Sequence, residues 1–156
     1  MHKTSDPTNW GKITDAHNIS SHFGILDKLE EHSHSASKVY PTLSNGIVLT
    51  TGTPAWTLGS FIQIVPVSTI LNDFDIHFIS IENISAVGVY EIVLYYGDTD
   101  IECGRVRFTK TAVMDTTMNI KMMTNIIPSG SKIRAKIASS TGNADTVTIS
   151  LLYHIY

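Results

Sequence analysis

Residues 132–156 read KIRAKIASSTGNADTVTISLLYHIY, and this stretch decides the fold. In its first seven residues, apolar side chains alternate with Lys and Arg, which is the pattern of a β-strand with one buried face. Residues 141–143 (Thr-Gly-Asn) have the chemistry of a turn. From Val147 to Ile155 every second residue is again apolar. The stretch therefore predicts two strands separated by a turn.

The same alternation continues upstream and predicts seven further strands. They are expected at residues 38–43, 47–51, 56–65, 74–81, 89–96, 101–109 and 119–127. In residues 74–81, one face is expected to carry Phe74, Ile76 and Phe78, and the other Asp75, His77 and Ile79. Short strands with turns about every 8–12 residues are typical of an antiparallel β-sandwich of eight or nine strands. We expect a jelly roll, because the Cys and Trp spacing of immunoglobulin-like domains, the competing topology, is missing.

The first 37 residues differ in composition from residues 38–156, which we interpret as the β-sandwich domain. Residues 1–18 are polar and are typical of an arm that needs a partner to order it. Residues 19–31 carry apolar side chains at helical spacing and predict one short helix. Because so short a helix is marginal alone, its apolar stripe must pack on its own domain, on copies of itself, or on a partner. The candidate residues for anchoring or oligomerisation are Trp10, Ile13, Ile19, Phe23, Leu26 and Leu29.

The composition limits the class of protein. The chain has 156 residues, a formal net charge of -3 and 16% charged residues. This mildly acidic balance argues against a dedicated nucleic-acid binder, which normally carries a basic excess. No apolar run approaches the roughly 20 residues that cross a bilayer, and the N-terminus lacks the apolar run of a secretory signal. The single cysteine forms no intrachain disulfide, so we expect synthesis in a reducing cytoplasm.

Sequence motifs for catalysis are missing. There is no phosphate-binding loop, no Gly-x-Ser-x-Gly elbow and no Cys-x-x-Cys pair. Cys103 lies in a predicted strand and is expected to be a buried, inert thiol. The chain is predicted to be non-enzymatic, since an enzyme would need a cleft that joins His77, Asp75 or Glu91.

His32 and His34 are the sharpest local signal for a metal. In an extended segment, residues two apart point the same way, so both imidazoles can face one ion. A cupin site is excluded, because its Gly and Glu positions hold Leu26 and Lys38 or Val39 here. On a three-fold axis, three copies would bring six imidazoles together, a site suited to iron or nickel. The competing interpretation is a pair of solvated linker histidines with no cofactor.

Charged and aromatic residues suggest surfaces. A basic stripe would form, if their strands paired, from Arg105, Arg107 and Lys110 with Lys132, Arg134 and Lys136. Such a stripe is typical of a solvent-facing strand, and a docking patch for an acidic partner is the alternative. Asp98 and Asp100 lack the ligand spacing of an EF-hand and are expected to be solvated turn residues. Tyrosines and Trp56 offer a stacking platform for sugars, but alternation places Tyr90 and Tyr96 on an apolar face.

A set of short stretches spread over residues 38–156 carries a family resemblance. They are 38–43 (KVYPTL) with Gly46, 55–59 (AWTLG), 64–66 (IVP), 74–77 (FDIH), 90–95 (YEIVLY), 105–108 (RVRF), 133–136 (IRAK) and 153–154 (YH). Together they resemble a domain that recurs in structural proteins of tailed bacteriophages, of the head decoration and head-fibre type.

The resemblance implies a homotrimeric β-sandwich on the exterior of a capsid, made in the host cytoplasm. Its N-terminal region would anchor it to the major capsid protein or to another virion protein. We expect neither nucleic acid nor a membrane as a partner. The rival interpretation is a carbohydrate-binding jelly roll for receptor recognition, which predicts exposed aromatic side chains with Asp, Asn or Gln beside them.

Overall fold

The computed structural model describes residues 36–113 and 117–156. The predicted arm and the predicted helix at residues 19–31 lie outside these ranges. Within them the regular structure is entirely β-strand. No helix in the described ranges is long and apolar enough to cross a membrane.

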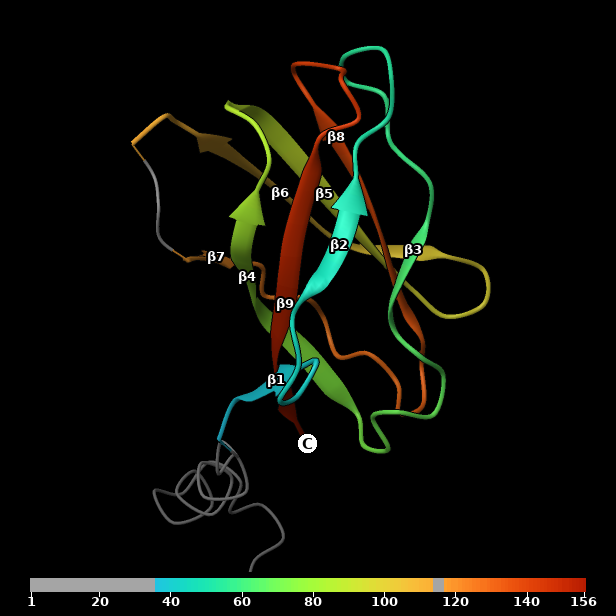
Figure 1. Ribbon diagram of the computed structural model, residues 1–156. Coiled ribbons are helices and arrows are strands. Elements are labelled where there is room, and N and C mark those ends of the chain that lie inside the picture. The colour runs from blue at the N-terminus through green and yellow to red at the C-terminus, as the bar shows by residue number, and fades with distance from the viewer. Residues whose placement is uncertain (1–35, 114–116) are drawn as a thin grey trace, which may run out of the picture. The chain divides into compact units, whose positions relative to one another are not determined.

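The described residues form nine strands in two antiparallel sheets (Figure 1). The first sheet has the order β1-β9-β4-β7, with β2 also paired to β9, and the second has the order β3-β8-β5-β6. The strands are β1 (Lys38–Tyr40), β2 (Ile47–Thr50), β3 (Ile62–Val65), β4 (Phe74–Ile84), β5 (Gly88–Tyr96), β6 (Ile101–Lys110), β7 (Met118–Lys121), β8 (Ile133–Ser139) and β9 (Thr146–Ile155). Each predicted strand overlaps one of them.

The strand pairing is nested along the chain. β2 pairs with β9, β3 with β8, β4 with β7, and β5 with β6. Successive pairs belong alternately to the first and the second sheet. This is the connectivity of a jelly roll, and it confirms the predicted fold class.

The hydrophobic core lies between the two sheets, where the predicted alternation places it. Fully or almost fully buried side chains include Val147, Ile149 and Leu151 of β9, Ile133, Ala135 and Ile137 of β8, and Tyr90, Ile92 and Leu94 of β5. Each large apolar side chain buried in this way stabilises the fold by about 1.5–3 kcal/mol before the entropy of ordering is subtracted. The two sheets are therefore held together mainly by aliphatic packing.

The predicted phase of β4 is wrong beyond Ile76. The pairing with β9 shifts register between Ile76 and Phe78, so His77 is the extra residue of a β-bulge. The bulge reverses the alternation: Ile79 is fully buried in the core, and Phe78 is only half-buried. His77 thus stays on the outer face beside Asp75.

β1 ends at Tyr40, earlier than predicted, and β3 and β7 are also shorter than predicted, although the pairing of these last two continues in irregular form. Before β3, the backbone N–H groups of Trp56 and Gly59 donate to carbonyls of β8 at 2.8 and 2.9 Å. After β7, Met122 N donates to the carbonyl of His77 at 2.8 Å. Residues of the predicted ranges 56–65 and 119–127 that lie outside β3 and β7 therefore still form backbone hydrogen bonds with β8 and β4, respectively.

Candidate functional site

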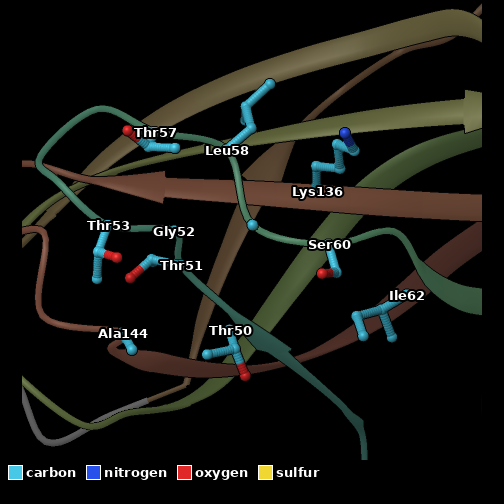
Figure 2. A pocket seen from close by; sticks show the side chains of 11 residues that line it. Thr50, Thr51, Gly52, Thr53, Thr57, Leu58, Ser60, Ile62, Lys136 and Ala144 are labelled. Carbon is cyan, nitrogen blue, oxygen red and sulfur yellow. The ribbon is translucent and has the colours of Figure 1, made fainter.

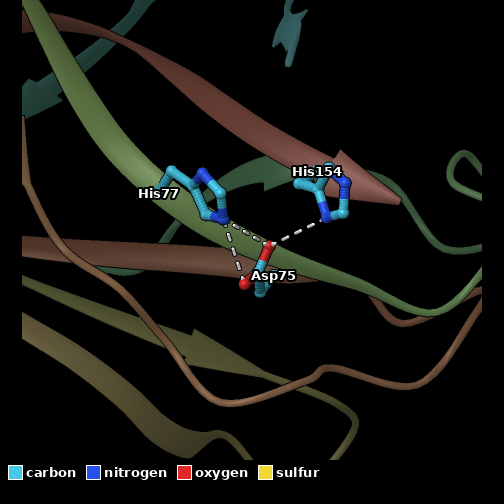
Figure 3. Close-up of side chains that lie close together, drawn as sticks. All are labelled: Asp75, His77 and His154. Carbon is cyan, nitrogen blue, oxygen red and sulfur yellow. Dashed lines mark hydrogen bonds and ion pairs between the residues drawn. The ribbon is translucent and has the colours of Figure 1, made fainter. Parts of the chain in front are cut away.

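A carboxylate and two imidazoles meet on the outer face of the first sheet, and we call Asp75, His77 and His154 the Asp-His-His cluster (Figure 3). Asp75 and His154 lie opposite each other on β4 and β9. His77 Nε2 lies 3.1 Å from Asp75 Oδ1, and His154 Nδ1 lies 3.9 Å from the same oxygen. One ligand atom from each of the three residues falls within 4.8 Å of the others.

The Asp-His-His cluster is largely shielded from solvent. Asp75 is 6% exposed and His154 is 4% exposed, while His77 is half-buried. The two imidazoles stack with ring centroids 5.6 Å apart and an angle of 19° between their planes. The ring of Tyr156 lies edge-on to His154 at 4.9 Å. The side chains therefore hold each other in place through ring contacts as well as charge.

The two oxygens of Asp75 have different surroundings. Oδ2 accepts a hydrogen bond from the hydroxyl of Tyr156 at 3.0 Å and lies 3.2 Å from His77 Nε2. Burial, followed by this hydrogen bond, raises the pKa of the Tyr156 phenol. In the described part of the chain, no hydrogen bond reaches Oδ1, although both imidazoles face it. Such a set of donors can hold a cation or share a proton.

Two residues of the Asp-His-His cluster can be placed together from the sequence, and the third cannot. Alternation placed Asp75 and His77 on one face, which the structure confirms. Glu91, the third residue considered for an enzyme, lies on β5 in the other sheet and takes no part. His154 was missed, because only the pairing of β4 with β9 brings it opposite Asp75. No local pattern in the sequence reports that pairing.

The outer face of the second sheet carries paired charges, which changes the predicted basic stripe. β6 and β8 do not pair with each other, because β5 lies between them. Glu91 of β5 forms ion pairs with Arg105 and Arg107 at 2.6 and 2.5 Å. Hydrogen bonding from Arg107, more than any other cause, lowers the pKa of Glu91.

The turn between β5 and β6 supplies two further ion pairs to the same face. Asp98 contacts Lys132 at 3.0 Å, and Asp100 forms an ion pair with Arg134. Asp98 is solvated as expected, with its side chain 95% exposed, whereas Asp100 is partly buried because β8 runs beside the turn: Gly97 N donates to the carbonyl of Lys132. Four of the six residues of the predicted stripe thus have acidic partners.

Aromatic side chains lie among these charges. Phe61 packs edge-on against Tyr95, with the ring centroids 5.1 Å apart. The guanidinium carbon of Arg134 lies 4.4 Å from the centroid of the Phe61 ring. Trp56 is 48% exposed, with Arg107 4.9 Å from its ring centre. Tyr90 is fully buried, as alternation predicted.

A groove rich in hydroxyl groups opens at the segment that follows β2 (Figure 2). Its volume is ≈ 640 Å³. Thr50, Thr51, Thr53, Thr57 and Ser60 line it, together with Lys136 of β8. The arrangement offers several hydrogen-bonding groups and one cation to a polar ligand.

Thr51, which lines this groove, belongs to a buried polar network. Ser139 Oγ donates to Asp145 Oδ2 at 3.1 Å and lies in hydrogen-bond contact with Thr51 Oγ1 at 3.3 Å. Thr141 also donates to Asp145. Because buried polar groups must be paired, this network ties the segment after β2 to the loop between β8 and β9.

Two loops at the lower end of the sandwich in Figure 1 expose large apolar side chains. We call residues 66–73 and 122–132 the end loops. Ser68 N donates to Gly130 O at 2.9 Å, and Gly130 N donates to Ile70 O at 2.7 Å. The exposed apolar residues on the end loops are Val67, Leu71, Met123 and Ile126.

Cys103 is half-buried on β6. Burial raises the pKa of its thiol to about 12. So high a pKa leaves almost no thiolate at neutral pH, in line with the inert thiol predicted from the sequence.

The other site residues predicted from the sequence lie outside the described ranges. These are the anchoring residues Trp10, Ile13, Ile19, Phe23, Leu26 and Leu29 and the metal candidates His32 and His34. No protein-family model and no curated protein matches this chain. The likeness to phage head proteins therefore stays a prediction from the sequence.

Proposed function

We propose that this protein is a non-enzymatic structural protein of a tailed phage, which decorates the capsid or forms part of a head fibre. It would act by forming a homotrimer on the capsid exterior and by anchoring through residues 1–31. The observation that carries this proposal is the jelly roll with four large apolar side chains exposed on its end loops.

The end loops favour an assembly surface over a flexible lid. Backbone hydrogen bonds join them, and Phe74 of β4 forms a further bridge with Ile127 at 2.7 and 3.0 Å. Leu71 is nevertheless 75% exposed. Exposed apolar side chains on two hydrogen-bonded loops support a surface that binds another protein, if they gather into one patch.

The charges on the second sheet also support a protein as the partner. Glu91 and Glu102 share Arg105 between them, so these ion pairs are satisfied within the chain. A surface with internally paired charges attracts polyanions weakly, in keeping with a protein partner and not nucleic acid.

The N-terminal residues supply the anchor in this proposal. Phe23, Leu26 and Leu29 recur at helical spacing on a segment too short to be stable alone. Three such segments on one trimer would bind a capsid with an avidity far above that of a single contact.

The test is a binding assay on capsids of the phage whose genome encodes the chain. Deleting residues 1–31 should leave a folded β-protein that no longer co-sediments with the capsids. A triple variant, Phe23→Ser with Leu26→Ser and Leu29→Ser, should lose binding as well. The matched control, Ser20→Ala with Ser21→Ala and Ser33→Ala, should bind like the unaltered chain. Retained binding by the deleted protein would refute the anchoring role.

A carbohydrate-binding module is the second candidate, favoured by the hydroxyl-lined groove and by Trp56 on the segment that forms its wall. Exposed aromatic rings stack on sugars, and hydroxyl groups bind their polar edges. This candidate predicts clear hits on a glycan array that disappear in Trp56→Ala. If the array gave no hits, the carbohydrate-binding candidate would be rejected and the structural proposal would remain.

A further inference from the structure

We propose that Asp75, His77 and His154 form a mononuclear binding site for a first-row divalent transition metal, with Zn²⁺ as the probe ion. The site would tie the C-terminal end of β9 to β4. It is separate from the predicted His32 and His34 pair and needs no second copy of the chain.

The geometry of the Asp-His-His cluster fits one ion. Both imidazoles present a nitrogen to Asp75 Oδ1, at 3.1 Å for His77 and 3.9 Å for His154 (Figure 3). With metal–ligand bonds of about 2.0–2.2 Å, neighbouring ligand atoms lie roughly 3–3.6 Å apart. The three atoms already fall within 4.8 Å of one another, so small side-chain rotations would close the site.

The donor set selects the class of metal. Two imidazole nitrogens and one carboxylate oxygen are the ligands of many three-residue zinc sites and of non-haem iron sites. Calcium and magnesium prefer oxygen ligands throughout and are disfavoured by the two imidazoles.

The surroundings of Asp75 also favour a cation. A carboxylate that is 6% exposed needs a positive partner, because burying an unpaired charge is costly. The Tyr156 hydroxyl occupies Oδ2 and leaves Oδ1 directed between the two imidazoles. A hydrogen bond to the second oxygen of a carboxylate ligand is the outer-sphere support that metal sites normally have.

The backbone that carries the ligands is fixed before any ion binds. His77 is the extra residue of the bulge and lies on the face of Asp75, and bulges are common next to functional sites. Met122 N donates to the carbonyl of His77, and Ile76 N donates to the hydroxyl of Thr124 at 2.9 Å. Hydrogen bonds on both sides of the bulge therefore preorganise the site.

The competing interpretation is a metal-free relay, in which a protonated imidazole pairs with Asp75. With a relay, the Tm of the protein would depend on pH and not on added metal. A metal site would respond to the ion at constant pH, so the two interpretations can be separated in solution.

The test uses the full-length protein after treatment with a chelator. Titration with Zn²⁺ at pH 7.5 should give one ion per chain by calorimetry. At a 100-fold excess over Kd, Tm should rise by about 5–10 °C. Co²⁺ should give a visible ligand-field absorption band, which reports directly on the coordinating groups.

Variants assign the binding to the Asp-His-His cluster. Asp75→Asn and His154→Ala should each weaken Zn²⁺ binding at least 100-fold and remove the Co²⁺ band. Circular dichroism of each variant checks that the β-fold is kept, and His77→Gln serves as a further variant if either one fails to fold. The control, His32→Ala with His34→Ala, should bind one ion per chain as before.

Two results would overturn the proposal. One is an unaltered chain that takes up neither Zn²⁺ nor Co²⁺ and whose Tm depends on pH alone, which would establish the relay. The other is binding that survives in Asp75→Asn and His154→Ala but disappears in the His32 and His34 variant.

Discussion

Glu91 lies between Arg105 and Arg107 on the outer face of the second sheet and pairs with both. Its carboxylate accepts hydrogen bonds from each guanidinium, at 2.6 Å for Arg105 Nη1 and 3.0 Å for Arg107 Nε. The arginines are largely solvated, so salt and water weaken the attraction. The net contribution to stability is therefore modest and depends on pH.

Replacing this carboxylate tests the contribution. The pKa of Glu91 is lower in the folded state than its ordinary value of 4.5. The ion pairs therefore stabilise the fold above the ordinary pKa, and this stabilisation is lost as the pH falls through the lowered folded-state pKa. Glu91→Gln should reduce the free energy of unfolding by about 1 kcal/mol at pH 7, and by less in strong acid. Urea unfolding of the unaltered chain and of Glu91→Gln, at pH 7 and in strong acid, measures this loss.

Glu102 provides the matched control, because Arg105 is its one ion-pair partner within residues 36–113 and 117–156 and its side chain is 44% exposed. Glu102→Gln should therefore cost less than Glu91→Gln at pH 7. Equal losses in the two variants, or no loss in either, would contradict the role given to Glu91.

At the scale of the element, β4 marks the limit of what alternation can predict. Nine strands and most of their buried faces follow from period-two patterning and turn residues, as in β8 and β9. The bulge at His77 does not, because no Gly or Pro marks it and its cause is the register with β9. The same long-range pairing brings His154 to Asp75, so one of the three residues of the Asp-His-His cluster could not be predicted for the same reason.

Because of the bulge, the neighbouring residues Phe78 and Ile79 differ in burial, and mutation of each can measure this difference. Ile79 is fully buried in the core, while Phe78 is half-buried on the other face. Ile79→Ala should lower the free energy of unfolding by about 2–5 kcal/mol, through lost burial and the cavity left behind. Phe78→Ala should cost less than half of that, although it removes the larger side chain. Chemical unfolding of both variants decides it, and the reverse order would mean that the regular alternation holds.

For the whole molecule, nested pairing makes the jelly roll a fold of long-range contacts. β2 pairs with β9 across about a hundred residues of chain, and β3 with β8 across about seventy. Composition and turn spacing were enough to favour this class, because a chain of many short alternating strands has few ways to bury one face of each. The surfaces that such a molecule offers to partners depend on loops, and the exposure of the end loops had no local signal in the sequence.

Symmetric assembly is the claim on which the proposed function depends most. The exposed apolar side chains of the end loops are open to a further protein surface in this proposal. A second and a third copy of the chain would supply it under closed three-fold symmetry.

Sedimentation equilibrium of the full-length chain at micromolar concentration tests this claim most directly. We expect a single species with three times the 17.2 kDa mass of one chain. A strict monomer at every concentration would contradict the account.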